Sequence, residues 1–441
     1  MTITRSRITK LTVEGFKSIR DRQAIELKPL TVLAGANSSG KSSIMQPLLL
    51  LKQTIESPGD PGAILLNGDH VQFSLADQVV SRLANADRSK HAEFTVELDI
   101  SDYESLLLRF RKAERSGFEA VEMRYENRDE ERFSIRPGMS HAEIVDAIPP
   151  SWERTLFEGI TRKGEGRRLS VFRDRCFLDV KFRRMDSSEP GWSGPGAVPF
   201  IPRFESHIEG IIHLPGLRGN PRRTYPRMAA GPVFEGTFEH YVASLIDAWQ
   251  RDQSPNLERL EKALRNLGLT WRLCAEGVDD TQIQLKAGRL PVQDGESDMV
   301  SIADMGLGIS QSLPVLVSLI AANPGQLVYI EQPEIHLHPL AQRSLAGVLI
   351  DAIQHGANVV IETHSSLLLR QLQTAVASDK LDPDMMVLHW FSRDKDGWSQ
   401  ISTAEPDENG AYGDWPADFD TTELEAERAY LDAVEARGAA E

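Results

Sequence analysis

Cysteine is scarce in this sequence of 441 residues, which holds only Cys176 and Cys274. The two lie far apart, and neither has a His or Cys neighbour at the spacing of zinc ligands. The sequence therefore excludes a disulfide framework and a zinc site of that kind as the basis of the fold. Two ordinary reduced cysteines are the interpretation that remains.

Long apolar runs are also lacking. None reaches the roughly 18 residues that a membrane-spanning helix needs. The first residues, MTITRSRITKLTVEGF, pass from charged side chains directly into an alternating pattern, without the apolar core of a signal peptide. We therefore expect a cytoplasmic protein without a membrane segment, which argues against a transporter.

The chain is acidic, with a formal net charge of −16. Residues 403–441 hold 12 acidic and 2 basic side chains, so most of the excess lies in this tail. Because nucleic acids attract basic surfaces, the net charge argues against a nucleic-acid partner, but the rest of the chain leaves room for a local basic patch. The candidate patch comprises Arg218, Arg222, Arg223 and Arg227. The alternatives are a solvated loop or a partner for the acidic tail.

Apolar patterns at both chain ends predict an α/β fold. Continuous apolar runs that predict strands alternate with segments that predict helices, which is typical of a mostly parallel sheet covered on both faces. The predicted strands are 8–13, 24–27, 30–34, 326–330 and 358–362, and the main predicted helices begin at residue 42 and span 310–322 and 339–354. One head assembled from both ends of the chain is the simplest interpretation.

The middle of the chain differs in composition. It mixes strand-like pieces such as EFTVELDI and FLDVKF with heavily charged stretches, and it ends in SSEPGWSGPGAVPFIP, a loop rich in Gly and Pro. We predict four parts, which are an N-terminal part of the head at 1–91, an inserted α+β middle lobe of unknown role at 92–204, a C-terminal part of the head at 205–402 and an acidic tail at 403–441.

The segment GANSSGKS matches the phosphate-binding loop, with a predicted strand before it and a predicted helix after it. Backbone N–H groups of such a loop point at phosphates, Lys41 would reach the terminal phosphates, and the Ser42 hydroxyl would bind Mg²⁺. The residues predicted to bind the cofactor here are Gly35, Asn37, Ser38, Ser39, Gly40, Lys41, Ser42 and Ser43. The predicted cofactors are ATP and Mg²⁺.

A second motif, LVYIEQPE, is an apolar strand that ends in a carboxylate. Beside a phosphate loop, Glu331 would hold the same Mg²⁺ directly or through water. Taken alone, a solvated acid at a strand end would explain it equally well.

Two further segments are weak signals by themselves. In IETHSS, His364 follows another apolar strand and would contact a γ-phosphate or the attacking water. In DMGLGISQSLP, Gly308, Ser310 and Gln311 stand at a helix start that suits an anion. A structural histidine and an ordinary helix cap are the alternatives.

The order of these motifs resembles that of ABC-type ATPase heads, in the soluble branch that includes the SMC, RecF and OLD families. ITKLTVEGFKSIRD is similar to the strand motif that opens such heads, GLGISQ to their signature motif, IEQPEIHLHP to the metal and base strand, and ETHS to the switch histidine. HLPGLRGNPRRTYP and GDWPADFD resemble segments of a prokaryotic branch that ends in a short C-terminal domain of unknown function. The resemblance covers residues 1–80 and 205–420.

The resemblance implies an α/β fold, namely an ABC-type P-loop NTPase head with an inserted middle lobe. It also implies a homodimer, or a higher oligomer, in which Gly308, Ser310 and Gln311 act on ATP bound by the partner. Gln332 stands where the family places the glutamate that activates water, and an amide cannot accept a proton. We therefore expect slow hydrolysis unless another residue replaces the missing base. Glu334 and His338 are the candidate replacements.

Three functions follow. The first is a homodimeric switch ATPase that senses nucleic acid or a foreign protein and controls a separate effector, with anti-phage defence as the setting. The second is a DNA repair or nuclease-associated ATPase, although roughly 75 residues after His364 are too few for the nuclease domain of OLD enzymes. The third is a nucleotide-stabilised scaffold that does not hydrolyse ATP.

Overall fold

The computed structural model describes residues 6–81, 92–100, 103–115, 117–129, 131–152, 167–184, 192–193, 198–229, 231–291 and 298–413. The GDWPADFD segment beyond Gly413 and most of the predicted acidic tail lie outside the described residues.

The described helices follow the apolar periodicity of the sequence closely. The helices are α1 (Lys41–Ile55), α2 (His141–Ala147), α4 (Ile201–Glu209), α5 (Val242–Arg251), α6 (Pro255–Asn266), α7 (Leu307–Ala321), α8 (Pro339–Gln354) and α9 (Ser366–Ala377), with short 3-10 turns at η1 (Ala76–Gln78), η3 (Phe238–Tyr241), η4 (Ile302–Asp304) and η5 (Pro383–Met385). Pro47 lies inside α1, as predicted, and the helix continues through it.

The strands form four sheets in the described part of the chain. The strands are β1 (Ile8–Glu14), β2 (Gln23–Glu26), β3 (Leu30–Gly35), β4 (Glu93–Ile100), β5 (Glu104–Lys112), β6 (Phe118–Glu126), β7 (Arg132–Ile135), β8 (Arg167–Asp174), β9 (Phe177–Arg184), β10 (Trp192–Ser193), β11 (Ile212–Leu214), β12 (Tyr225–Pro226), β13 (Leu273–Gly277), β14 (Gln282–Gly288), β15 (Met299–Ser301), β16 (Leu327–Glu331), β17 (Asn358–Glu362), β18 (Met386–Arg393) and β19 (Ser399–Ala404).

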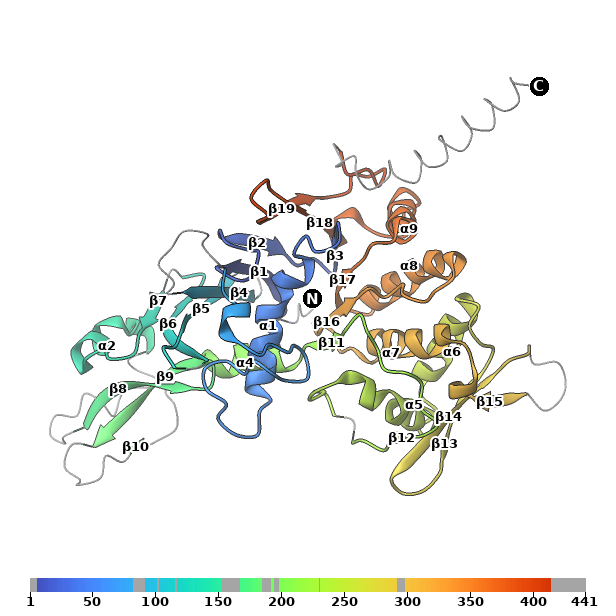
Figure 1. The fold of residues 1–441 in the computed structure, drawn as a ribbon, viewed down its shortest axis with the longest axis horizontal. Coiled ribbons are helices and arrows are strands. Elements are labelled where there is room, and N and C mark those ends of the chain that lie inside the picture. Colours follow the sequence, from blue (N-terminus) through green and yellow to red (C-terminus); the bar gives the residue numbers. More distant parts are fainter. Residues whose placement is uncertain are drawn as a thin grey trace.

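The central sheet has the order β11-β16-β17-β3-β18-β19. Its strands are parallel except for β19, which pairs antiparallel with β18. The buried strands β3, β16 and β17 therefore place their carboxyl ends at one edge of the sheet. This arrangement confirms the predicted α/β fold with a mostly parallel sheet, and it brings the two chain ends together (Figure 1).

A second, antiparallel sheet has the order β2-β1-β4-β5-β6-β7. Because β4 pairs with β1 along six residue pairs, this sheet continues across the predicted boundary between 91 and 92. The charged stretch that received no sequence prediction forms β5 to β7, where apolar side chains alternate with charged ones. The division of the chain into four parts remains a prediction.

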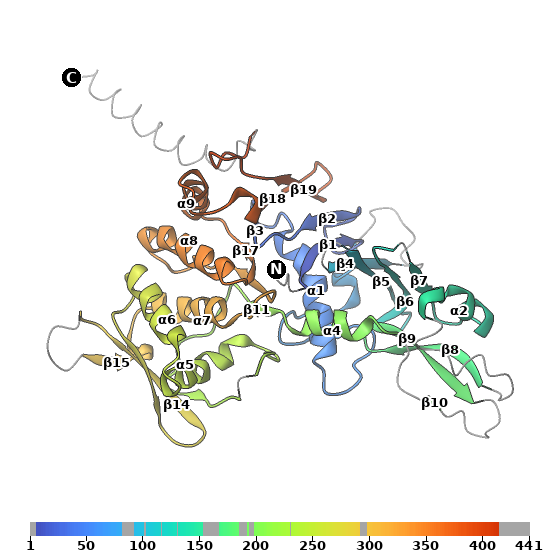
Figure 2. The ribbon, with the colours of Figure 1, turned by 180° about the vertical axis from the view of Figure 1, so that it is seen from behind.

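Helix α1 lies between the two sheets, with the middle segment on one side and helices α5 to α9 on the other (Figure 1, Figure 2). One core joins α1 to the antiparallel sheet and to side chains of the central sheet such as Leu33, Tyr329 and Val360. The other core covers the opposite face of the central sheet, where Val32, Ile330 and helices α5 to α9 pack together. Both faces of the sheet are therefore buried, as its continuous apolar strands predicted.

The first prediction concerns the joint between β1 and the middle segment. Phe94 on β4 is buried and packs edge to face against Phe16 at 5.6 Å and against Phe118 at 5.1 Å. Phe94→Ala should lower the free energy of unfolding by about 3–5 kcal/mol in denaturant titrations. The exposed Leu75 gives a control, since Leu75→Ala should change it by less than about 0.5 kcal/mol. A cost for Phe94→Ala as small as that of the control would contradict the shared core.

Candidate nucleotide site

A polar pocket of about 420 Å³ lies at the carboxyl edge of the central sheet. Its lining comprises Lys17, Ser18, Asn37, Ser38, Ser39, Gly40, Lys41, Ser42, Ser43, Gln46, Gln332, Glu362, His364 and Arg393. Three basic side chains and the N-terminus of α1 face it beside a single carboxylate, so the pocket suits a polyanion.

The phosphate loop connects β3 to α1 and depends on glycine at two positions. Gly35 has φ +138°, and a Cβ there would lie 2.2 Å from the Phe391 carbonyl oxygen. Gly40 has φ +107°, and a Cβ there would meet the Ser399 hydroxyl at 2.1 Å. Only glycine fits the close backbone approach at Gly35, and the positive φ at both positions would strain any other residue.

The end of the central sheet holds this loop in place. The Ser399 hydroxyl donates to the Ser39 carbonyl at 2.6 Å, and Arg393 Nε donates to the Ser38 carbonyl at 2.6 Å. The Ser18 and Ser399 hydroxyls lie 2.7 Å apart. Residues about 360 positions apart in the sequence therefore shape one loop.

The Lys41 ammonium lies across the loop and donates to the carbonyls of Gly35 at 2.9 Å and Ala36 at 2.8 Å. Burial lowers the pKa of Lys41, and the nearby charge of Glu362 opposes that shift. The amine is thus held at the floor of the pocket, where a terminal phosphate would give it a charged partner.

The carboxylate that contacts Ser42 is Glu362, the last residue of β17. The Ser42 hydroxyl donates to Glu362 Oε2 at 2.9 Å, and the Tyr329 hydroxyl donates to Glu362 Oε1. Burial raises the pKa of Glu362 to about 7, and the neighbouring charge of Glu331 adds to the shift. Sequence reasoning missed this residue, although it stands in the quoted IETHSS segment after a buried strand.

Glu331, the predicted metal ligand, does not line the pocket. Its carboxylate accepts from the Gly216 N–H at 3.3 Å and lies 3.3 Å from His213 Nε2. It nevertheless stands directly opposite Glu362 in the register of β16 and β17. Burial alone would raise the pKa of Glu331, but the hydrogen bond to His213 and the charges around it hold this pKa below its usual value.

Gln332 lines the pocket, as predicted for the residue after Glu331. Its backbone has φ +45°, a left-handed conformation that is uncommon outside glycine. The Gln332 N–H donates to the Glu362 carbonyl at 2.8 Å, and Arg218 donates to the carbonyls of Glu331 at 2.8 Å and Gln332 at 3.4 Å. These bonds hold the turn that points the amide toward the pocket.

The two candidate replacement bases make their contacts away from the pocket. Glu334 is 8% exposed, and its Oε1 accepts from the Thr363 hydroxyl at 2.7 Å and the His364 N–H at 3.0 Å, whereas its buried Oε2 has no hydrogen-bond partner among the described residues. His338 caps α8 by accepting from the Leu340 N–H at 3.3 Å. Neither side chain lines the pocket.

His364 lies at the pocket, as predicted, and follows β17. Burial lowers its pKa, the positive charge of Lys41 lowers it further, and a hydrogen bond with the Gly35 backbone opposes both. The lowered pKa favours the neutral imidazole, which carries one N–H donor and one acceptor nitrogen.

The predicted signature residues begin α7 and do not line this pocket. Ser310 donates to the Leu307 carbonyl at 3.0 Å. The buried Gln311 amide donates to the Gly219 carbonyl at 3.0 Å and to the Arg218 carbonyl at 3.4 Å. Gln311 thus fastens the 216–219 loop to α7, whereas Gly308 stays near the helix start.

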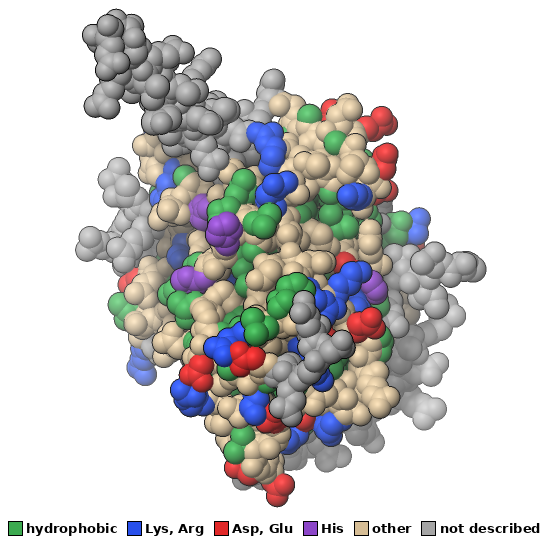
Figure 3. Space-filling view, turned by 90° about the vertical axis from the view of Figure 1, so that its right-hand side faces the viewer, with side chains coloured by type: hydrophobic (Ala, Val, Ile, Leu, Met, Phe, Trp, Pro, Cys, Tyr) green, Lys and Arg blue, Asp and Glu red, His purple; other side chains and the backbone are tan. Residues whose placement is uncertain are grey.

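The four arginines of the predicted basic patch do not form one open surface. Arg218 is buried, and burial lowers its pKa to about 10. Arg223 pairs with Asp304 at 2.7 Å, and Arg227 pairs with Asp247 at 2.5 Å. Arg222 is exposed. On the face seen in Figure 3, acidic and basic side chains are interspersed.

Several pocket residues were not predicted as site residues. Lys17 and Ser18 stand in the segment ITKLTVEGFKSIRD, and Lys17 donates to Gln46 Oε1 at 2.9 Å. Arg393 lies on the β18–β19 hairpin, which no motif marks and which also carries Ser399, the partner of the Ser39 carbonyl. Only the fold could bring that hairpin to the phosphate loop.

The pocket has the residues that ATP and Mg²⁺ require. Mg²⁺ is usually bound through a Ser or Thr hydroxyl and one or two carboxylates together with substrate phosphates, and Ser42 with Glu362 matches that donor set. Among the described residues, no three His, Cys, Asp or Glu side chains cluster as metal ligands. No helix in the described part of the chain has the length and apolar character of a membrane span.

Comparison with protein families gave two matches. The family described as "AAA ATPase domain" matches residues 7–139, and the family described as "AAA domain, putative AbiEii toxin, Type IV TA system" matches residues 221–370. Both describe ATPases, and they fall on the segments that carry the phosphate loop and the acidic strand. The chain is a P-loop ATPase. The short C-terminal domain that the sequence suggested remains a prediction.

Solved structures similar to this ATPase include heads of SMC proteins. An SMC head bound to the C-terminal winged-helix domain of ScpA has 13% identity and a TM-score of 0.45, with 90% of this chain and 98% of that chain covered. An SMC head from Pyrococcus furiosus, bound to the C-terminal domain of ScpA, has 13% identity and a TM-score of 0.43, with 98% and 100% covered. The SMC head of Thermotoga maritima has 14% identity and a TM-score of 0.37, with 90% and 98% covered. A search of curated proteins gave no match.

The second prediction concerns Glu362. Mg²⁺ should tighten ATP binding by the wild type, and Glu362→Gln should reduce this Mg²⁺ effect by about tenfold or more because the carboxylate beside Ser42 is lost. Affinity for ATP without metal should stay within about twofold, whereas Lys41→Ala should lower it by about tenfold or more. Calorimetric titration with and without Mg²⁺ measures both.

A matched control for Glu362 is Glu276→Gln, which removes an exposed carboxylate on β13. It should behave as the wild type. An undiminished Mg²⁺ effect in Glu362→Gln would contradict the assignment of this residue to the metal.

Proposed function

We propose that this chain is a slow, homodimeric switch ATPase that acts as a sensor or regulator in an anti-phage defence system and controls a separate effector. The observation that carries the proposal of slow ATP hydrolysis is Gln332, at the position where the catalytic base is expected. Gln332 lines the pocket there, whereas Glu334 and His338 do not line it. A site that lacks a positioned base retains ATP for longer.

In this proposal each pocket residue has one role. The loop from Gly35 to Ser43 and Lys41 bind the phosphates, and Ser42 with Glu362 would hold Mg²⁺, next to Glu331. Bound Mg²⁺ would neutralise charge that develops on the phosphate oxygens. Gln332 orients the attacking water without accepting its proton, and His364 donates a hydrogen bond to the γ-phosphate.

The proposed dimer follows from the placement of α7. Gly308, Ser310 and Gln311 lie outside the pocket of their own chain. The start of α7 also exposes Leu307, which is 46% exposed. A helix N-terminus with small residues suits the phosphates of an ATP bound by a partner chain.

The proposed setting draws on one family description. The family that matches residues 221–370 is described with a toxin of a toxin–antitoxin system. We infer that this chain, too, works with a toxic effector. The alternative, an ATPase that acts on DNA ends, is less favoured because Arg218, Arg223 and Arg227 are engaged within the chain.

The third prediction tests the base position. Gln332→Glu should raise steady-state phosphate release by at least about tenfold, since a positioned general base contributes about 10²–10⁴-fold. Gln284→Glu, outside the pocket, should leave the rate unchanged. A wild-type rate that equals that of Gln332→Glu would sink the proposal of a slow site.

The fourth prediction tests the dimer. Leu307→Arg places a charge on an exposed position of the proposed interface and should prevent ATP-dependent dimerisation in light-scattering chromatography, while ATP binding persists. Leu290 is 60% exposed and gives the control Leu290→Arg, which should dimerise as the wild type does. If Leu307→Arg dimerises at the ATP concentrations at which the wild type dimerises, α7 does not lie in the interface.

A further inference from the structure

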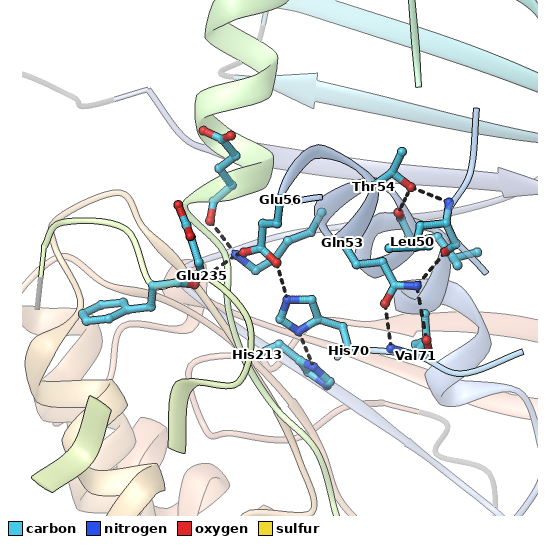
Figure 4. A network of polar contacts seen from close by, with 12 residues as sticks. Leu50, Gln53, Thr54, Glu56, His70, Val71, His213 and Glu235 are labelled. Carbon is cyan, nitrogen blue, oxygen red and sulfur yellow. Dashed lines mark hydrogen bonds and ion pairs between the residues drawn. The ribbon is translucent and has the colours of Figure 1, made fainter. Parts of the chain in front are cut away.

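A chain of buried polar side chains runs from the end of α1 through His70 to His213 (Figure 4), and His213 contacts Glu331. Lys52 and Glu56 form an ion pair at 2.6 Å on α1, and Glu56 Oε2 lies 3.0 Å from His70 Nε2. His70 Nδ1 lies 3.4 Å from His213 Nδ1, and His213 Nε2 lies 3.3 Å from Glu331 Oε1. We call Glu56, His70 and His213 the relay.

The loop that carries His70 is fastened to α1 by Gln53. The Gln53 amide donates to the carbonyls of Leu65 at 2.6 Å and Val71 at 3.2 Å, and its oxygen accepts from the Val71 N–H at 3.0 Å (Figure 4). Glycine at position 68 leaves space for the Gln53 side chain, since a Cβ there would lie 2.7 Å from it. These bonds hold the chain before and after His70 and so fix its position beside α1.

His213 is fixed equally well. It pairs with Tyr329 in the register of β11 and β16, and the two rings stack at 5.3 Å with an angle of 14°. The side chains of His70 and His213 are each 2% exposed. Lys52 also donates to the Glu209 carbonyl at 2.6 Å, which ties the relay to the end of α4.

Stability alone is a weak reason for such a chain. Buried charged and polar groups lose hydration, and apolar side chains of similar volume often stabilise a core as well or better. The relay ends at Glu331, and Glu331 stands opposite Glu362 beside the pocket. Groups that hydrogen-bond to an acid near a metal fix its orientation, and their loss typically costs about 10–100-fold in metal affinity.

We propose that His213 and His70 are positioning residues that hold Glu331 in place beside Glu362 and thereby set how strongly Mg²⁺ supports nucleotide binding. The inference rests on the proposed function, in which Ser42 and Glu362 hold the cation. Nothing in the sequence links these two histidines, which are separated by 143 positions.

The test compares two replacements of His213. His213→Phe keeps a ring that can stack on Tyr329 but loses both nitrogens, whereas His213→Gln places an amide near the position of Nε2 and can still donate to Glu331. His213→Phe should reduce the Mg²⁺ effect on ATP affinity by about tenfold, with metal-free affinity within about twofold. His213→Gln should restore the effect to within about threefold of the wild type.

A double-mutant cycle separates positioning from simple packing. If His213 acts through Glu331, His213→Phe should have little further effect on the Mg²⁺ dependence in a Glu331→Gln background. His389 gives the control, since it is equally buried but hydrogen-bonds to the Glu26 carbonyl and Thr403, outside the pocket. His389→Phe should lower the melting temperature without changing the Mg²⁺ effect.

The outcomes are distinguishable. A wild type whose ATP affinity is indifferent to Mg²⁺ would overturn the proposed metal site and the relay with it. Suppose instead that the wild type depends on Mg²⁺. If His213→Phe then changes the Mg²⁺ effect no more than His389→Phe does, or if the effects of His213→Phe and Glu331→Gln simply add, the positioning role of the relay is wrong and the proposed metal site stands. If His213→Phe does not fold, His70→Phe takes its place, because His70 reaches Glu331 only through His213 and should give a smaller effect of the same kind.

Discussion

The pairing of two carboxylates at the ends of neighbouring strands is the constraint on which the site depends. Glu331 and Glu362 stand opposite each other in register, where Glu362 is buried and the Glu331 side chain is 23% exposed. Like charges this close raise the proton affinity of one partner, unless a cation or hydrogen bonds compensate. Ser42 and Tyr329 supply hydrogen bonds to Glu362, and His213 and Gly216 supply them to Glu331. A divalent cation from the pocket side would complete the compensation.

The strand order of the central sheet explains why the two ends of the chain fold as one unit. Strand β3 lies between β17 and β18, so the phosphate loop emerges among residues from the far end of the sequence. Ser399 and Arg393 then fix the loop through its carbonyls. These bonds hold the loop in shape, and a loop that is already shaped loses less entropy when it binds phosphates.

Much of the fold could be predicted from the sequence, because the strands of a covered parallel sheet are continuous apolar runs and the helices between them are periodic. The phosphate loop, Gln332 and His364 were found as motifs, and the structure brings them to one pocket. Two buried strands end in an acid, and Glu362 was missed because the carboxylate that contacts Ser42 depends on which of the two strands lies beside β3. The engagement of Glu334 and Gln311 could not be predicted either, since their partners, Thr363 and the 218–219 carbonyls, meet them only in the folded chain.

The central claim is that this ATPase retains ATP instead of cycling rapidly. A single-turnover experiment tests it most directly, with the full chain in excess over labelled ATP and Mg²⁺ and with bound ATP and ADP measured over time. Typical enzymes turn over at about 10 s⁻¹, and the missing base should slow this by about 10²-fold or more. We therefore predict conversion of bound ATP at about 0.1 s⁻¹ or slower. Conversion at about 10 s⁻¹ would contradict the account and would mean that another group takes the proton.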